Sequence, residues 1–335
     1  MKIGKVLKGV ITTSPPPVSA IGAVDTLSLV VEIERLGTSN LGEFGSQAFA
    51  LFEHSFPNPD EREPVEDIVE RIKRYELTGP DADGAEFHSH VFLNANRQVL
   101  AYSQGSIMPC GKDGLCYFWQ YGCVADEDFT QKHYSIPVGA RSQGLSKWMH
   151  WVNTETLRCR ATTQGLKSLD LEVWETEQLG LGANELEVKY TATRLQIHTK
   201  SGARVLLGLK KDGRTFVNPY VQARLSPDSD PIVLHLLVRQ NVSKEITMDT
   251  AKAIVLRGLV ENFRREGFRK QDVDEVEVEM QNRFAECDKI LLLSFHELPN
   301  AFQLAQTDKL FESQLIKLYN CNSLQEAELR YKSYH

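Results

Sequence analysis

A short run of residues between a predicted strand and a predicted helix has the composition of an anion-binding turn. It comprises Arg141, Ser142, Gln143, Gly144, Leu145 and Ser146. Backbone N–H groups at the start of a helix, together with the helix dipole, stabilise phosphate oxygens. Gly144 has no Cβ to block a ligand, and Arg141 adds a positive charge suited to pyrophosphate. The alternative interpretation is an ordinary glycine turn that precedes a helix.

This run resembles the pyrophosphate loop of the GNAT superfamily of acyl-CoA-dependent N-acyltransferases, whose signature is Gln/Arg-x-x-Gly-x-Gly/Ala. Arg141 and Gly144 match the signature, and Ser146 stands where glycine or alanine is expected. The resemblance covers about residues 26–240. It implies that the run binds acetyl-CoA, or another acyl-CoA, as a co-substrate.

A second segment, residues 194–203 (RLQIHTKSGA), is similar to the family's later motif Ala-x-x-Leu-Tyr-x-x-x-Gly-Phe. In that family a helix ends at the glycine and leads into the next strand. Ile197, Gly202 and Ala203 fit the apolar, glycine and apolar positions, whereas Arg194 replaces the alanine. Two motifs in the expected order support the resemblance better than either motif alone.

Amide formation from a thioester needs a proton acceptor for the amine and a proton donor for the leaving thiolate. The family commonly has a tyrosine where this chain has His198, so the resemblance implies His198 as the donor, with Tyr190 as a second candidate. Asp126, Glu127 and Glu172 are candidates for the acceptor, and each would need desolvation to raise its pKa. A structural histidine and solvated carboxylates are the alternatives.

The spacing before the loop departs from the family. There, the strand that contacts the pantetheine arm runs almost directly into the pyrophosphate loop, but residues 125–140 intervene here. Either part of this stretch is an insertion, or the strand ends near residues 136–138. Both registers stay open, and the candidate backbone contacts are Cys123, Val124, Val138 and Ala140.

Periodicity and turn residues predict alternating strands and helices around these motifs. We expect strands at 27–36, 87–93, 98–103, 115–124, 169–174, 202–209, 232–238 and 289–294. We expect helical segments at 42–54, from Pro64 onwards, from Leu145 onwards, around 248–259 and at 303–319, while 190–198 fits a helix or a strand.

Composition excludes several classes of protein. The chain has 335 residues, 41% of them hydrophobic, and a net charge of −7, which argues against nucleic-acid binding and against attachment to anionic lipid. No apolar stretch approaches the roughly 20 residues that span a bilayer. The histidines lack the partners and spacing of a metal site, so we predict no metal. The six cysteines are expected to be reduced, in a cytoplasmic protein.

These observations predict an α/β fold with a GNAT-like mixed, mostly antiparallel sheet flanked by helices, and a C-terminal α/β extension. The expected division is an irregular arm (1–24), an acyltransferase domain (25–240) and the extension (241–335). The expected activity is acyl transfer, most simply of acetyl, from CoA to a primary amine of a small molecule or protein. The alternatives are a silent domain that binds acyl-CoA or a protein partner, and acyl transfer to a carrier protein. The extension could cap the sheet, shape the acceptor cleft or form a homodimer surface.

Overall fold

A computed structural model describes residues 31–57, 62–111, 114–136, 139–141, 144–178, 181, 184–224, 230–240 and 246–333. The predicted N-terminal arm lies outside these residues. The chain divides into two compact units. The first comprises the described residues of Met1–Ile107 and Trp119–Thr156, and the second those of Met108–Phe118 and Leu157–His335.

The first unit contains β1 (Glu32–Arg35), β2 (Glu86–Leu93), β3 (Val99–Pro109) up to Ile107 and β4 (Gly114–Val124) from Trp119, and these strands are neighbours in that order. The pairs β1–β2 and β2–β3 are antiparallel, with Ile33 opposite Phe92 and His90 opposite Ser103. The predicted strands 87–93 and 115–124 are confirmed, and the strand predicted at 98–103 continues to Pro109. All eight residues of β2 are buried, because both of its faces are covered.

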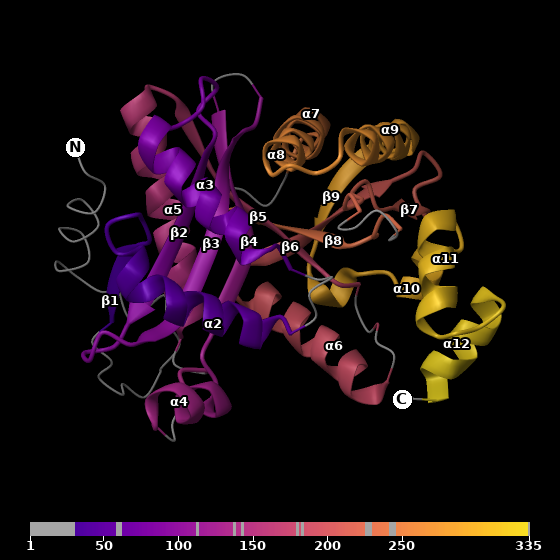
Figure 1. Cartoon of the computed structure of the whole chain (residues 1–335). Coiled ribbons are helices and arrows are strands. Elements are labelled where there is room, and N and C mark those ends of the chain that lie inside the picture. The colour runs from indigo at the N-terminus through magenta and orange to yellow at the C-terminus, as the bar shows by residue number, and fades with distance from the viewer. Residues whose placement is uncertain are drawn as a thin grey trace. The chain divides into compact units, whose positions relative to one another are not determined.

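Helices cover these strands on two sides (Figure 1). A π-helical turn, η2 (Leu41–Gly45), leads into α2 (Ser46–Ser55), and α3 (Val65–Thr78) follows Pro64, where proline was expected to open a helix. The apolar side chains of α2 and α3 form one buried cluster with those of β2 and β3. On the other side lies α5 (Leu145–Gln164), which buries Leu145, Met149 and Val152.

In the second unit, residues Gly114–Phe118 of β4 pair in parallel with β5 (Lys167–Thr176), and the order then runs β5, β8 (His235–Gln240), β6 (Ala203–Leu209) and β7 (Phe216–Val217). The pairs beyond β5 are antiparallel, including β9 (Lys289–Leu293) on β6. The predicted fold class, a mixed and mostly antiparallel sheet flanked by helices, is therefore confirmed.

Alternation along the strands of the second unit separates two faces. One, here the α6 face, carries Trp174 and Leu237 and is covered by α6 (Glu185–Lys200). The other, the C-terminal face, carries Val173 and Leu236, which share one large cluster with the helices that follow residue 247. These are α7 (Met248–Lys252), the π-helical η4 (Ala253–Leu259), α8 (Val260–Arg265), α9 (Lys270–Glu286), η5 (Phe295–Glu297), α10 (Ala301–Ala305), α11 (Lys309–Leu318) and α12 (Leu324–Ser333).

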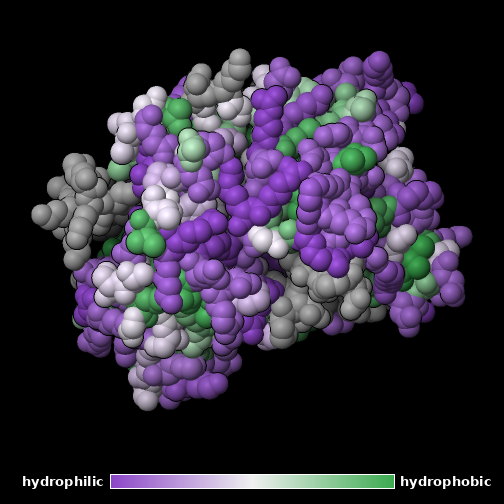
Figure 2. Space-filling model, turned by 45° about the horizontal axis from the view of Figure 1, so that its top comes forward, coloured by the Kyte–Doolittle hydropathy of each residue, from purple (hydrophilic) through white to green (hydrophobic). Residues whose placement is uncertain are grey.

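The C-terminal residues thus share a core and a sheet with the strands before them. Ile290 of β9 stands opposite Gly208 of β6 and belongs to the same buried cluster as Val173 and Leu236. The division predicted at residue 240 stays a prediction. On the face drawn in Figure 2, hydrophilic residues predominate and hydrophobic side chains occupy separate small areas.

One cysteine prediction is wrong. Cys110 and Cys116, which lie on either side of the turn between β3 and β4, are joined in a disulfide instead of being reduced. The turn brings the two strand ends together, because the Cys110 N–H donates to the Gly114 carbonyl over 2.8 Å. The remaining cysteines, Cys123, Cys159, Cys287 and Cys321, are free. Within the described residues no helix is long and apolar enough to cross a membrane.

Candidate active site

The predicted anion loop lies against the end of β4. The chain leaves β4 at Val124, forms α4 (Glu127–Tyr134) and returns, so that the Ala140 N–H donates to the Ala125 carbonyl over 2.8 Å. A Cβ on Gly139 would lie 2.6 Å from the backbone nitrogen of Glu127, so this approach requires glycine. Of the two registers left open, the structure supports the one in which the strand ends at Val124. Val138 lies outside the described residues.

The helix α4 accounts for the extra length. Asp126 is its N-cap, and its carboxylate accepts the Phe129 N–H over 2.9 Å. Ser135 ends the helix in the left-handed conformation, with φ 57°. Glu127, a predicted proton acceptor, lies exposed in the first turn, where a negative charge favours the helix dipole.

Gly144 stands directly before α5 with the backbone geometry that the loop argument requires. Its φ is +76°, and no heavy atom would come within 4 Å of a Cβ there. Leu145 is 3% exposed and anchors the helix, whereas Ser146 is exposed. In the first turn of α5 the Lys147 N–H donates to the Gly144 carbonyl over 3.0 Å, whereas the N–H groups of Leu145 and Ser146 point out of the start of the helix, where a ligand can accept from them. Ser142 and Gln143 lie outside the described residues.

Arg141 is held beside the loop by a weak ion pair. Its guanidinium Nη2 lies 3.1 Å from Asp126 Oδ2, and its side chain is 61% exposed. His54 Nε2 contacts the other Asp126 oxygen, Oδ1, at 2.9 Å. Burial opposes ionisation of Asp126, yet the hydrogen bonds from Phe129 and His54 and the Arg141 charge lower its pKa. Asp126 therefore keeps its Phe129 and His54 partners if the Arg141 side chain turns to a phosphate. Breaking the exposed Arg141–Asp126 ion pair costs about 1 kcal/mol or less.

The end of β4 offers backbone rather than side-chain chemistry. The Cys123 thiol is 2% exposed, and burial raises its pKa to about 12, so it is neutral at physiological pH. Val124 is half-buried and Ala140 is 2% exposed. The role that the resemblance implies for these three residues uses their backbone N–H and carbonyl groups and not their side chains.

In the second unit, the segment around His198 has the predicted local structure. The helix α6 ends at Lys200, Gly202 has φ +94°, and β6 begins at Ala203. The half-buried His198 ring meets Trp174 edge to face, with 5.3 Å between ring centroids. The structure decides for a helix over residues 190–198.

The other two candidates of this unit lie in different environments. Glu172 is 3% exposed and stands opposite Arg239, whose Nη1 lies 3.4 Å from Glu172 Oε2. The Arg239 Nε also donates to the Ser201 carbonyl at 3.1 Å. Glu172 is therefore committed to a network that joins β5, β8 and the turn after α6. Tyr190 is 58% exposed on α6.

Sequence reasoning missed Glu175, which lies on the C-terminal face of β5. This half-buried carboxylate stands opposite Leu236 and accepts a hydrogen bond from the buried Tyr220 hydroxyl. Burial raises the pKa of Glu175 to about 8. The signal was present in the sequence, because Leu171, Val173 and Glu175 alternate along one strand face.

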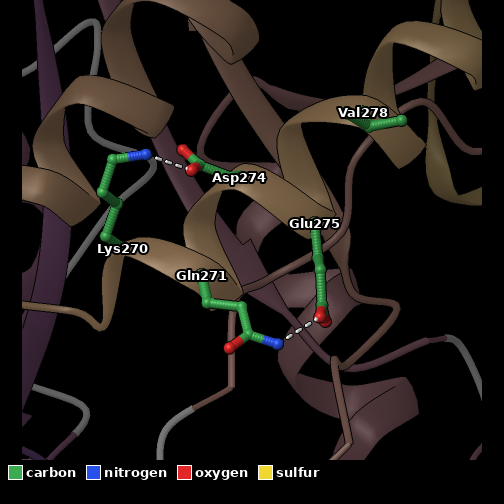
Figure 3. Close-up of a pocket in the computed structure, with 5 residues that line it drawn as sticks. All are labelled: Lys270, Gln271, Asp274, Glu275 and Val278. Carbon is green, nitrogen blue, oxygen red and sulfur yellow. Dashed lines mark hydrogen bonds and ion pairs between the residues drawn. The ribbon is translucent and has the colours of Figure 1, made fainter.

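A hollow along α9 lies outside these groups (Figure 3). Its lining residues all come from one exposed side of that helix: Lys270, Gln271, Asp274, Glu275 and Val278. Lys270 pairs with Asp274, and the Gln271 side chain donates to Glu275 over 3.1 Å. These i,i+4 pairs are those of a solvated helix face. Among the described residues, no cluster of His, Cys, Asp and Glu could hold a metal ion.

No protein-family model and no curated protein matches the sequence. The solved structures that the chain resembles include two described as acetyltransferases of the GNAT family. One, from Bacteroides thetaiotaomicron, is 16% identical, over 63% of this chain and 88% of that one, with a TM-score of 0.36. Another, from Staphylococcus aureus Mu50, is 12% identical, over 62% and 98%, with a TM-score of 0.33.

The chain also resembles the NatC complex bound to Gag peptide and CoA. That likeness has 10% identity, covers 63% of this chain and 98% of the other, and has a TM-score of 0.34. Such values leave the function to be argued from the chain's own residues.

Proposed function

We propose that the chain is an N-acyltransferase that moves an acetyl or other acyl group from CoA to a primary amine of a small molecule or protein. The return of the anion loop to the end of β4, fixed by the Ala140–Ala125 hydrogen bond, carries the proposal. The stretch of chain that follows this hydrogen bond holds an exposed arginine, an open left-handed glycine and the start of a 20-residue helix. The two motif resemblances support it.

The residues fit a pyrophosphate. Gly144 leaves space above the backbone, and the first turn of α5 supplies N–H donors and the positive end of a helix dipole. Arg141 would exchange Asp126 for a phosphate oxygen. In the acyl transfer itself, His198 is the proposed proton donor to the leaving thiolate, because a neutral-pH imidazole can exist in both protonation states.

A silent domain that binds acyl-CoA is the second candidate. Two of the carboxylates predicted to accept a proton, Asp126 and Glu172, are committed to arginine partners. Such a domain would bind CoA without releasing thiol. Acyl transfer to a carrier protein would release thiol only with that acceptor.

Thermal unfolding of the full chain with acetyl-CoA, CoA or NAD tests the proposal first. A ligand at about 100 times its Kd adds about 2.7 kcal/mol, which raises Tm by a few degrees. We expect a shift with both CoA species and none with NAD, followed by thiol release in a screen of primary amines. No shift with either CoA species would contradict the loop assignment.

The variant Arg141→Gln sharpens this test. Loss of charge-assisted hydrogen bonds to phosphate should weaken CoA binding by about tenfold or more. Arg158→Gln is the matched control, because Arg158 is also half-exposed and pairs with one aspartate, Asp170, at 2.9 Å. Equal loss of affinity in both variants would mean that Arg141 has no specific contact with the ligand.

A further inference from the structure

We propose that His54 is a positioning residue for Arg141: when its imidazole gains a proton, it takes over the Asp126 carboxylate and releases the arginine to a ligand phosphate. This role rests on the proposed function, because the phosphate is that of CoA. It adds a property that acyl transfer does not require. Binding of the pyrophosphate group is accompanied by proton uptake at His54, and therefore depends on pH.

One oxygen of the Asp126 carboxylate is shared between the two cationic side chains. His54 Nε2 lies 2.9 Å from Asp126 Oδ1 and 3.1 Å from Oδ2. Arg141 Nη2 lies 3.1 Å from the same Oδ2. An ionised carboxylate only accepts hydrogen bonds, so neutral His54 carries its hydrogen on Nε2 and its lone pair on Nδ1. The proton that charges the ring goes to Nδ1, and the contact with Asp126 is kept in both states.

The carboxylate is fixed, whereas the arginine is free to turn. Asp126 is the N-cap of α4 and accepts the Phe129 N–H over 2.9 Å. Burial opposes its ionisation, but its hydrogen bonds and the Arg141 charge lower its pKa, so it stays charged where histidines titrate. The Arg141 side chain is 61% exposed. The His54 side chain is 31% exposed, which gives its ring access to protons from water.

The other titratable groups beside His54 are occupied elsewhere. Glu53 precedes it on α2 and pairs with Arg62 at 3.0 Å. On α4, the Phe129 ring contacts both His54 and His133, with 5.4 and 4.3 Å between ring centroids. Burial and neighbouring positive charges lower the pKa of His133, so it resists protonation. His133 is thus a second histidine in the same surroundings, but its recorded contacts are with rings and not with the carboxylate.

The sign of the effect follows from the charge on His54. When the imidazole is neutral, Arg141 is the cation that balances Asp126, and a phosphate must compete for it. When the imidazole is charged, it balances the carboxylate and repels the guanidinium, so Arg141 leaves at a lower cost. Exposed ion pairs change an equilibrium constant by about fivefold at most. We therefore expect affinity for pyrophosphate to rise about two- to fivefold from pH 8.0 to pH 6.0.

The test measures the Kd of dephospho-CoA by calorimetry at pH 6.0 and 8.0, with the full chain. This probe keeps the pyrophosphate but lacks the phosphate monoester of CoA, which itself takes up a proton near pH 6. Wild type should bind about two- to fivefold more tightly at pH 6.0. His54→Gln, which can donate but cannot gain charge, should have one Kd at both pH values. The matched control His133→Gln should keep the wild-type ratio.

Asp126→Asn shows whether His54 acts through the carboxylate. Asparagine is as good an N-cap as aspartate, so α4 should be kept, while Arg141 loses its ion pair at either pH. We expect the ratio of the two Kd values to fall to about one. A wild-type ratio in this variant would mean that the imidazolium attracts the ligand directly, which overturns the positioning role.

His54→Lys provides the opposite readout, because it is charged at both pH values and should bind at both as wild type does at pH 6.0. The Tm of each variant without ligand reports on folding. If wild type binds dephospho-CoA equally at the two pH values, the role of His54 is overturned while the loop assignment stands. If wild type binds neither CoA nor dephospho-CoA, the proposed function fails, and this role fails with it.

Discussion

The backbone N–H of Ala140 donates to the carbonyl of Ala125 over 2.8 Å, across a segment that contains a whole helix. This single bond returns the chain to the end of β4 after α4. Ala140 therefore lies beside the end of β4, although α4 separates the two in sequence.

Gly139→Ala should disturb this return. The new Cβ would meet backbone atoms at 2.6 and 2.7 Å, which cannot move as a flexible side chain can. We expect a loss of about 1–3 kcal/mol in the free energy of unfolding, the usual cost of overpacking, together with weaker CoA binding. Urea unfolding and calorimetry measure the two effects.

The control for that variant is Gly42→Ala, because nothing lies within 4 Å of a Cβ there. It should leave both quantities unchanged. A Gly139→Ala protein that binds CoA as tightly as wild type would separate the Ala140–Ala125 contact from the ligand site.

Gly144→Asp should abolish CoA binding with little loss of stability. The substitution places a side chain and a negative charge in the space proposed for phosphate, while aspartate tolerates the left-handed conformation better than most residues. Gly165→Asp is the matched control, since Gly165 has φ +67° and equally open surroundings. Gly144→Asn separates charge from volume. Unchanged affinity of Gly144→Asp in calorimetry would exclude the loop as the phosphate site.

Local patterns predicted the elements that carry the site, because they depend on short-range physics. The apolar spacing from Leu145 onwards predicted α5, and the glycine at 202 predicted the end of α6. The prediction of a GNAT-like sheet was based on the two motifs and on the order of the predicted strands. The left-handed Gly144 and the start of α5 after it could be predicted because both have sequence signals, whereas phosphate binding by this loop stays a prediction.

The parts that the sequence left open depend on contacts between distant residues. Nothing local shows that Ala140 returns to Ala125, so two registers remained possible until the structure was known. Glu172 is among the proton acceptors predicted from the sequence, and its surroundings are set by a distant strand. The partner of Glu172, Arg239, lies 67 residues away on β8. Only the pairing of β5 with β8 shows that Glu172 is committed to an ion pair.

His198→Phe should lower kcat by about 10²-fold or more while CoA affinity is kept. Phenylalanine preserves the edge-to-face contact with Trp174 but cannot donate a proton. Turnover and CoA binding are measured on the same protein. Tyr190→Phe is the companion variant, and a loss of turnover there instead would transfer the donor role to Tyr190. A His198→Phe enzyme as fast as wild type would rule out the donor role of His198.

The stability of the chain should respond to pH through His235. Burial lowers the pKa of this histidine to about 3, so the folded state keeps it neutral. The unfolded chain binds the proton near pH 6.5, and stability is therefore lost as pH falls below that value. At pH 5.5 this amounts to about 1.4 kcal/mol for His235. The buried His90, whose pKa burial also lowers, acts in the same sense.

Glu175 acts in the opposite sense, because its raised pKa favours the folded state at low pH and that contribution is lost as pH rises through about 8. The effect of His235 is therefore isolated by comparing how much unfolding free energy wild type and His235→Asn each lose between the two pH values. Urea unfolding at pH 7.5 and 5.5 should show that His235→Asn, although less stable overall, lacks about 1.4 kcal/mol of the acid-induced loss found in wild type. Identical changes in both proteins would mean that His235 is protonated or solvated in the folded state.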